Sequence, residues 1–209
     1  LFLEHPKDER LSQTMPFRAR RRIVFLIHGW DFNPDMNWYP WLEKELLKKG
    51  FEVVVPRMPN TSEPKINEWV LYLKKVVGKL DKETYFVGHS IGCQAIIRFL
   101  QKENAKIGGA VFVAGWFKLK NLEDGEVKKI AEPWLKTPIN FSIVKKNIGK
   151  LTVILSDNEP YDYVKENKKI FEEKLRAKVI IEHKMGHFTG EDNVMEVPGV
   201  LKEFLEIVK

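Results

Sequence analysis

Short apolar runs alternate with amphipathic stretches along most of this chain, and that alternation restricts the fold more than any other feature. Residues 23–27 are continuously apolar, as expected of a strand covered on both faces, and 38–47 then carry apolar residues at helical spacing. The same patterns predict further strands at 51–55, 84–87, 107–114, 151–155 and 179–181, and further helices at 66–80, 93–101, 164–175 and 200–208. Strands alternating with helices form βαβ units. We therefore predict an α/β three-layer sandwich, with a mostly parallel sheet of about six strands and helices on both faces.

The chain's 209 residues fit a single domain, which we place at 23–209. Residues 1–22 have no clean periodicity and are predicted to be a loosely ordered leader. The segment 115–150 breaks the rhythm, because it is too long for a simple crossover and mixes aromatic residues with prolines and charges. We predict that it is an insertion or small cap over the carboxyl ends of the strands, where active sites of such sheets lie.

Composition excludes several classes of protein. Hydrophobic residues make up 44% and charged residues 31%, a balance that supports a folded core rather than a disordered chain. The longest apolar runs have five residues, whereas a membrane-spanning helix needs about 18. The N-terminus lacks the apolar region of a signal peptide, so a cytoplasmic protein is expected. With one cysteine, no zinc-ligand cluster and no dinucleotide fingerprint, no metal and no cofactor are expected.

The net charge of +6 invites a nucleic-acid interpretation, but the distribution of charge argues against it. Lysine pairs are spread over the chain with glutamates nearby, as on solvated helix faces. Arginines are dense only at 18–22, just before the first strand, where a solvated leader is the preferred interpretation. We therefore expect no nucleic-acid partner, and the sequence does not predict the oligomeric state.

A serine motif carries the clearest chemical signal. Gly88-His89-Ser90-Ile91-Gly92 follows a predicted strand and opens a predicted helix. This is the context of a nucleophile elbow, in which a serine sits on a tight strand-to-helix turn and flanking glycines leave room for the backbone. The alternative, a glycine-rich turn with a capping serine, is disfavoured by that context.

The chain resembles the small α/β-hydrolases related to retinoblastoma-binding protein 9 and the bacterial YdeN proteins. The resemblance covers essentially all of 23–209, and it rests on the motifs at 27–30, 37–42, 58–60, 88–92, 156–160 and 186–188. It implies a serine hydrolase of esterase or peptidase type. Some relatives are discussed as protein-interaction partners, although the Leu-x-Cys-x-Glu tract associated with retinoblastoma binding is absent here.

The base and the acid should follow the later strands. In the hydrolase order Ser…acid…His, the base is His183 or His187, and we favour His187 because it lies in a loop after Gly186. The resemblance implies the same histidine. Relatives carry an aspartate before the proline position of the fifth-strand loop; matched residue by residue, this carboxylate is Glu159. Asp157 remains open as the acid.

Backbone N–H groups should form an oxyanion hole, one from Ile91 directly after the serine and one from the loop after the first strand, at Trp30. Several aromatic residues near the strand ends could line an acyl pocket: Trp30, Trp38, Trp116, Trp134 and Phe188. Of these we take Trp38 and Trp116 as substrate-binding.

The predicted function is hydrolysis of an ester or amide of a small acyl substrate, through an acyl-enzyme intermediate and a Ser-His-acid triad. The alternative is a catalytically weak module that keeps the hydrolase fold for protein interaction.

Overall fold

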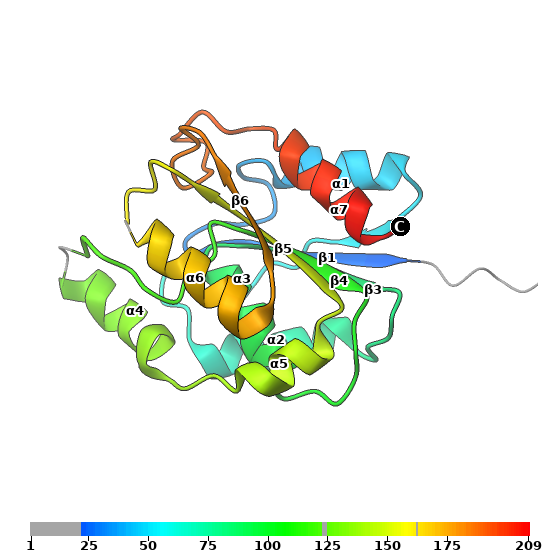
Figure 1. Cartoon of the computed structure of the whole chain (residues 1–209), viewed down its shortest axis with the longest axis horizontal. Coiled ribbons are helices and arrows are strands. Elements are labelled where there is room, and N and C mark those ends of the chain that lie inside the picture. Colours follow the sequence, from blue (N-terminus) through cyan, green and yellow to red (C-terminus); the bar gives the residue numbers. More distant parts are fainter. Residues whose placement is uncertain (1–21, 123–124, 162) are drawn as a thin grey trace, which may run out of the picture.

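The computed structural model describes residues 22–122, 125–161 and 163–209, and a parallel sheet forms its centre (Figure 1). Its strands are β1 (Ile23–Ile27), β2 (Glu52–Val54), β3 (Thr84–His89), β4 (Gly109–Val113), β5 (Lys150–Ser156) and β6 (Lys178–Glu182). They lie in the order β2-β1-β3-β4-β5-β6, and every neighbouring pair is parallel. The predicted α/β fold with a parallel sheet is confirmed.

Helices cover both faces of this sheet (Figure 1). They are α1 (Tyr39–Lys48), α2 (Ile66–Val77), α3 (Ile91–Leu100), α4 (Gly125–Lys136), α5 (Phe141–Asn147), α6 (Val164–Leu175) and α7 (Pro198–Ile207). Helices α1 and α7 pack together on one face, whereas α2, α3, α5 and α6 form a continuous layer on the other. The sheet is thus the middle layer of three.

The apolar run of β1 shows why its sequence lacks alternation. Successive side chains of a strand point to opposite faces. Phe25 and Ile27 therefore lie in the core beneath α2 and α3, while Val24 and Leu26 lie in the core beneath α1 and α7. Because both faces are covered by helices, every position from Val24 to Ile27 is buried.

The segment 115–150 contains two helices that the sequence analysis does not separate. Helix α5 packs against α3 and α6 and is part of the helical layer on the sheet. Helix α4 precedes α5 in the chain. It contains Pro133, which removes one backbone hydrogen bond of a regular helix. That the first part of this segment acts as a cap stays a prediction.

Residues 1–21 of the predicted leader lie outside the described residues. None of the helices in the described ranges is long and apolar enough to cross a membrane.

The strand order defines where a site should form. From β1 the chain moves outward to β2 and then returns to place β3 on the other side of β1. Such a reversal opens a crevice at the carboxyl ends of the two strands, where ligands of open α/β sheets bind. The loop at Gly29 follows β1 and Ser90 follows β3, so both lie at this reversal.

Candidate active site

Ser90 lies on a tight turn that requires glycine two residues before it and two residues after it. It joins β3 directly to α3 with a φ of 52°, a conformation uncommon for a residue with a side chain. A Cβ atom at Gly92 would lie 2.4 Å from the carbonyl oxygen of Ile27, and one at Gly88 would lie 2.8 Å from the side chain of Ile96. The two glycines therefore let α3 pack closely against β1 and β3, and this packing holds the strained turn at Ser90.

His187 connects Ser90 to Glu159. The imidazole Nε2 lies 2.8 Å from Oγ of Ser90, and Nδ1 lies 2.8 and 2.9 Å from the two carboxylate oxygens of Glu159. The side chains of His187 and Glu159 are only 13% and 11% exposed. In the tautomer that fits, Nδ1–H donates to Glu159 and Nε2 accepts from the Ser90 hydroxyl. The structure thus brings together the three residues that the sequence analysis favours.

Asp157, the other acid considered, lies elsewhere. Its carboxylate accepts the backbone N–H of Lys184 at 2.8 Å and lies 2.5 Å from Nδ1 of His183. The Lys184 N–H first, and His183 second, lower the pKa of Asp157. The side chain is 41% exposed and that of His183 is 74% exposed. This pair lies at the surface, and His183 orients the loop rather than facing Ser90.

A second acid holds the loop that carries His187. Asp192 accepts the backbone N–H of His187 at 2.9 Å and that of Thr189 at 3.0 Å. Gly186 makes room for it, because a Cβ there would lie 1.9 Å from Oδ1 of Asp192. The side chain of Asn158 accepts the Gly186 N–H at 2.8 Å. The backbone on both sides of the imidazole is thereby fixed by side-chain acceptors.

A buried hydrogen-bond chain links the same loop to the loop after β1. The N–H of Gly29 lies 3.1 Å from the hydroxyl oxygen of Tyr39, which accepts it. The Tyr39 hydroxyl lies 2.6 Å from Nδ1 of His89, and Nε2 of His89 lies 2.8 Å from the carbonyl oxygen of His187. The only donor order that satisfies every atom has the Tyr39 hydroxyl donating to Nδ1 and the His89 Nε2–H donating to the carbonyl of His187.

Burial keeps the side chains of Tyr39 and His89 neutral. It lowers the pKa of His89 to about 3, and the neighbouring His187 adds to the effect. Burial also raises the pKa of Tyr39 above its ordinary value. His89 and Tyr39 therefore hold one protonation state at ordinary pH, and the donor order of the chain does not change.

Trp116 is the aromatic residue in contact with the serine. Its indole Nε1–H lies 3.3 Å from Oγ of Ser90, and Gln94 holds its backbone carbonyl at 2.6 Å. Trp116, Glu159 and His187 line an enclosed space of about 10 Å³, close to the volume that one water needs. Trp116 is itself 4% exposed, so it contacts the nucleophile, and its contact with substrate stays a prediction.

The structure corrects the assignment of Trp38 as substrate-binding. Trp38 is 1% exposed, packs in the core beneath α1 and α7, and donates its indole N–H to the carbonyl of Phe188 at 3.0 Å. Trp134 and Phe188, also considered for the pocket, are equally buried. A fully buried ring supports the site from behind and has no surface for a substrate.

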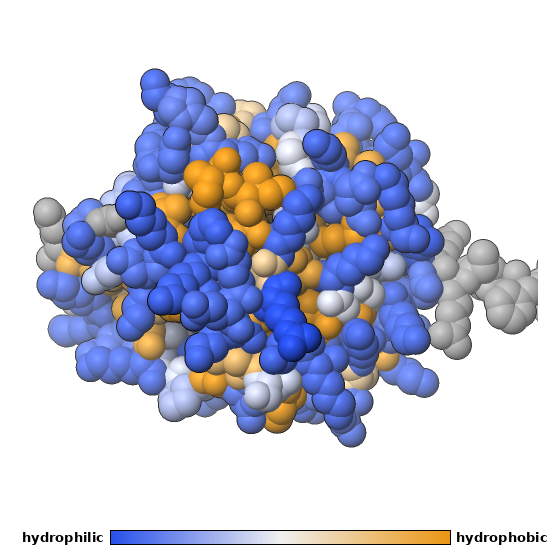
Figure 2. Space-filling model, viewed as in Figure 1, coloured by the Kyte–Doolittle hydropathy of each residue, from blue (hydrophilic) through white to orange (hydrophobic). Residues whose placement is uncertain are grey.

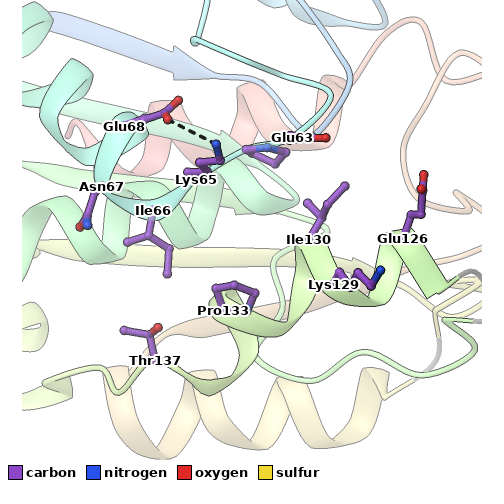
Figure 3. A pocket seen from close by; sticks show the side chains of 11 residues that line it. Glu63, Lys65, Ile66, Asn67, Glu68, Glu126, Lys129, Ile130, Pro133 and Thr137 are labelled. Carbon is purple, nitrogen blue, oxygen red and sulfur yellow. Dashed lines mark ion pairs between the residues drawn. The ribbon is translucent and has the colours of Figure 1, made fainter.

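A larger cavity lies away from these residues. It has a volume of about 750 Å³ and lies between the start of α2 and helix α4, where Ile66 points toward Pro133 and Ile130 points toward the segment that carries Glu63 (Figure 3). Neither Ser90, Glu159 nor His187 lines it. Its walls mix both signs of charge with apolar side chains, and it is separate from the candidate active site.

Within the described part of the chain, no group of three histidine, cysteine, aspartate or glutamate side chains is arranged to hold a metal ion. The single cysteine, Cys93, is buried, and burial raises the pKa of its thiol.

The sequence patterns assign no role to four residues that hold the site: Tyr39, His89, Asn158 and Asp192. The only signal for them is position, since Tyr39 and Asn158 lie inside motifs already noted and His89 precedes the serine. Their partners are distant in sequence, so spacing alone does not reveal them.

The sheet order, the turn at Ser90 and the loops after β5 and β6 define the chain as an α/β-hydrolase. Solved structures with this fold are similar over most of its length. The YdeN gene product from B. subtilis matches with a TM-score of 0.79 and 25% identity, over 89% of this chain and 98% of that one. Est1E from Butyrivibrio proteoclasticus matches with a TM-score of 0.66 and 14% identity, over 90% of this chain and 88% of that one.

The family model described as serine hydrolase matches residues 24–205, and the chain belongs to this family. It is 37% identical over 97 residues to YdeN of Bacillus subtilis (strain 168), which is 46% of this chain. That alignment spans about half (51%) of the curated relative's length. The resemblance to the YdeN proteins is confirmed.

Proposed function

We propose that this chain hydrolyses an ester or amide of a small acyl group through an acyl-enzyme intermediate, with Ser90 as nucleophile, His187 as base and Glu159 as orienting acid. The observation that carries the proposal is His187, whose two ring nitrogens contact Ser90 and Glu159 at 2.8 Å. A serine hydroxyl is a weak nucleophile until an adjacent base takes its proton, and a base needs a third group to set its tautomer.

The reaction proceeds in two steps. Oγ of Ser90 attacks the substrate carbonyl while Nε2 of His187 takes the hydroxyl proton, and the imidazolium then gives this proton to the leaving alcohol or amine. Water attacks the resulting acyl-serine, again losing a proton to His187, and the acid leaves with Ser90 restored. Glu159 keeps the Nδ1–H oriented and stabilises the imidazolium in both steps.

The oxyanion formed in each step is stabilised by backbone donors. We assign this role to the N–H groups of Ile91 and Trp30, as the sequence predicts. Two observations support the assignment. Ile91 is the first residue of α3, where N–H groups point away from the helix. In the described ranges, neither N–H has a hydrogen-bond acceptor, whereas the adjacent N–H of Gly29 is held by Tyr39.

A short acyl group fits the site better than a long one. The space beside the triad, lined by Trp116 and Leu119, measures about 10 Å³ and holds about one water, so an extended acyl chain would have to displace more of its lining than a short one. Trp116 also adds an N–H at the nucleophile, which can donate to an oxygen bound there. We therefore expect acetyl and propionyl esters to be better substrates than octanoyl esters.

A fluorophosphonate probe tests the proposal directly. Such a probe forms a phosphorus–oxygen bond with an activated serine and releases fluoride, so we expect one label per chain, located on Ser90 by mass spectrometry. Prior incubation with a short p-nitrophenyl ester should slow the labelling. Absence of both labelling and turnover on p-nitrophenyl esters of two to eight carbons would contradict the proposal and favour an interaction module.

Tyr39→Phe should lower kcat about 10- to 100-fold while KM stays nearly unchanged. The substitution removes one hydroxyl and keeps the ring, so Gly29 and His89 lose their shared partner. The loops that carry Trp30 and His187 are then no longer tied together, and small displacements of catalytic groups are costly. Steady-state kinetics with a short p-nitrophenyl ester measures the effect.

Tyr85→Phe is the matched control, because Tyr85 lies in the same core as Tyr39 but on β3. Tyr39→Phe should also lose more stability than Tyr85→Phe in thermal unfolding, because it leaves the buried Gly29 N–H and His89 Nδ1 without a partner, and only Tyr39→Phe should lose activity. Equal kcat values for the two variants would show that the Tyr39 hydroxyl has no positioning role.

A further inference from the structure

Strand β6 is an edge of the sheet and pairs on one side only, with β5. Its sequence is Lys178-Val179-Ile180-Ile181-Glu182, and α6 packs against it, whereas α7 packs on β4 and β5 (Figure 1). An exposed edge presents unpaired backbone N–H and C=O groups to any other strand. Proteins usually cover such an edge or pair it with a strand of another chain.

The hydrogen bonds to β5 show which backbone groups point outward. The N–H of Asp157 donates to the carbonyl of Glu182 at 3.0 Å, so Glu182 directs its backbone toward β5. Backbone direction alternates along a strand, so Ile180 points the same way while Val179 and Ile181 direct their N–H and C=O groups outward. In the described part of the chain, those outward groups have no partner.

The side chains of β6 are unusually apolar for an exposed edge. Ile181 is 41% exposed, and Val179 and Ile180 are only partly buried. Figure 2, drawn in the same view as Figure 1, shows apolar atoms gathered on the surface where β6 runs. A patch of this kind on a strand edge is typical of a surface that another chain covers.

The order of residues along β6 makes it complementary to itself. If two copies pair in antiparallel orientation with Ile180 opposite Ile180, then Val179 lies opposite Ile181 and Lys178 opposite Glu182. The residues whose backbone points outward, Val179 and Ile181, then become the hydrogen-bonded pairs. The apolar side chains face apolar ones, and both ends carry opposite charges, each favourable across strands.

Glu182 supports the same arrangement. Its carboxylate is partly buried, and burial raises its pKa. No basic side chain pairs with it within the described ranges. Lys178, which is ion-paired with Glu203 at 2.7 Å, still leaves its side chain 60% exposed. The Glu182 carboxylate packs against Gly199 at the start of α7, and in the antiparallel arrangement Lys178 of the second copy would lie opposite Glu182 across the strands.

We propose that two copies of the chain associate through β6, antiparallel about Ile180, so that one sheet continues through both copies. The contact is isologous, since each copy contributes the same residues. A five-residue strand with its flanking helices forms a small interface, so we expect a dissociation constant of about 1 to 100 μM.

Sedimentation velocity from about 1 to 200 μM tests the proposal. The wild type should pass from monomer to dimer within this range. Ile181→Lys, which places a charge opposite Val179, should raise the dissociation constant at least about 100-fold. Leu71→Lys is the matched control, because Leu71 is 66% exposed on α2, away from the edge, and this variant should dimerise like the wild type.

Charge exchange tests the register. Glu182→Lys should weaken the dimer by placing two lysines opposite each other, and Lys178→Glu combined with Glu182→Lys should restore it relative to the single variant. Thermal unfolding verifies that each variant is folded. A wild type that is monomeric at 200 μM, or a dimer that survives Ile181→Lys, would overturn the proposal.

Discussion

Replacing Ser90 by alanine is expected to reduce kcat for a short p-nitrophenyl ester about a million-fold. Without Oγ there is no atom to form the acyl-enzyme, and His187 has no hydroxyl within 2.8 Å to deprotonate. Residual hydrolysis above the uncatalysed rate would come from the oxyanion donors and from binding. The measurement needs highly purified enzyme and active-site titration of the wild type, because trace contamination sets the detection limit.

Ser142→Ala is the matched control, because Ser142 is an exposed serine on α5 and its loss should leave kcat unchanged. Both variants should unfold near the wild-type temperature, since removal of the Ser90 hydroxyl deletes only contacts to His187 and Trp116. If Ser90→Ala retained more than a tenth of wild-type turnover, Ser90 would not be the nucleophile.

Glu159→Gln is expected to lower kcat about ten-thousand-fold, as the equivalent change does in the chymotrypsin-type triad. Glutamine keeps the size of the side chain, but its amide can present an N–H to Nδ1 of His187. The imidazole then places its proton on Nε2, where it can no longer accept the proton of Ser90. Glu159→Asp should keep part of the activity, because the charge remains while the reach is shorter.

Asp157→Asn is the comparison that decides between the two acids. Asp157 contacts His183 and Lys184 at the surface, so its amide variant should retain nearly full kcat. The rates of the two amide variants are compared with the same ester and the same enzyme preparation. If Asp157→Asn lost most of its kcat while Glu159→Gln kept nearly all of it, the orienting acid would be Asp157.

The arrangement of strands and helices could be predicted because it depends on local patterns. Helix α6 coincides with the predicted range 164–175, and each predicted strand overlaps one that the structure contains. The exceptions are α4 and α5. Helix α4 carries apolar residues at helical spacing, but Pro133 within it argues against a helix, and α5 has only seven residues, too few for a long apolar stripe. Both are stabilised by packing against other helices more than by their own sequence.

The aromatic residues show where pattern reasoning fails. Trp38 and Trp116 both lie near the carboxyl ends of strands in the sequence, and nothing local separates them. In the folded chain, Trp38 turns into the core and binds the carbonyl of Phe188, while Trp116 turns toward Ser90. Which way a ring points depends on the neighbours that fill the space around it, and these come from distant segments.

Ser90 and its turn follow from the sequence by itself, because a strand, two glycines and a helix in immediate succession impose the local backbone. His187 as the preferred base follows from chain order. Only the tertiary structure shows that Glu159, and not Asp157 two residues before it in the same loop, lies within hydrogen-bond distance of Nδ1 of His187. It alone also joins Tyr39 and His89, 50 residues apart, because a buried hydrogen bond forms between groups that folding brings together.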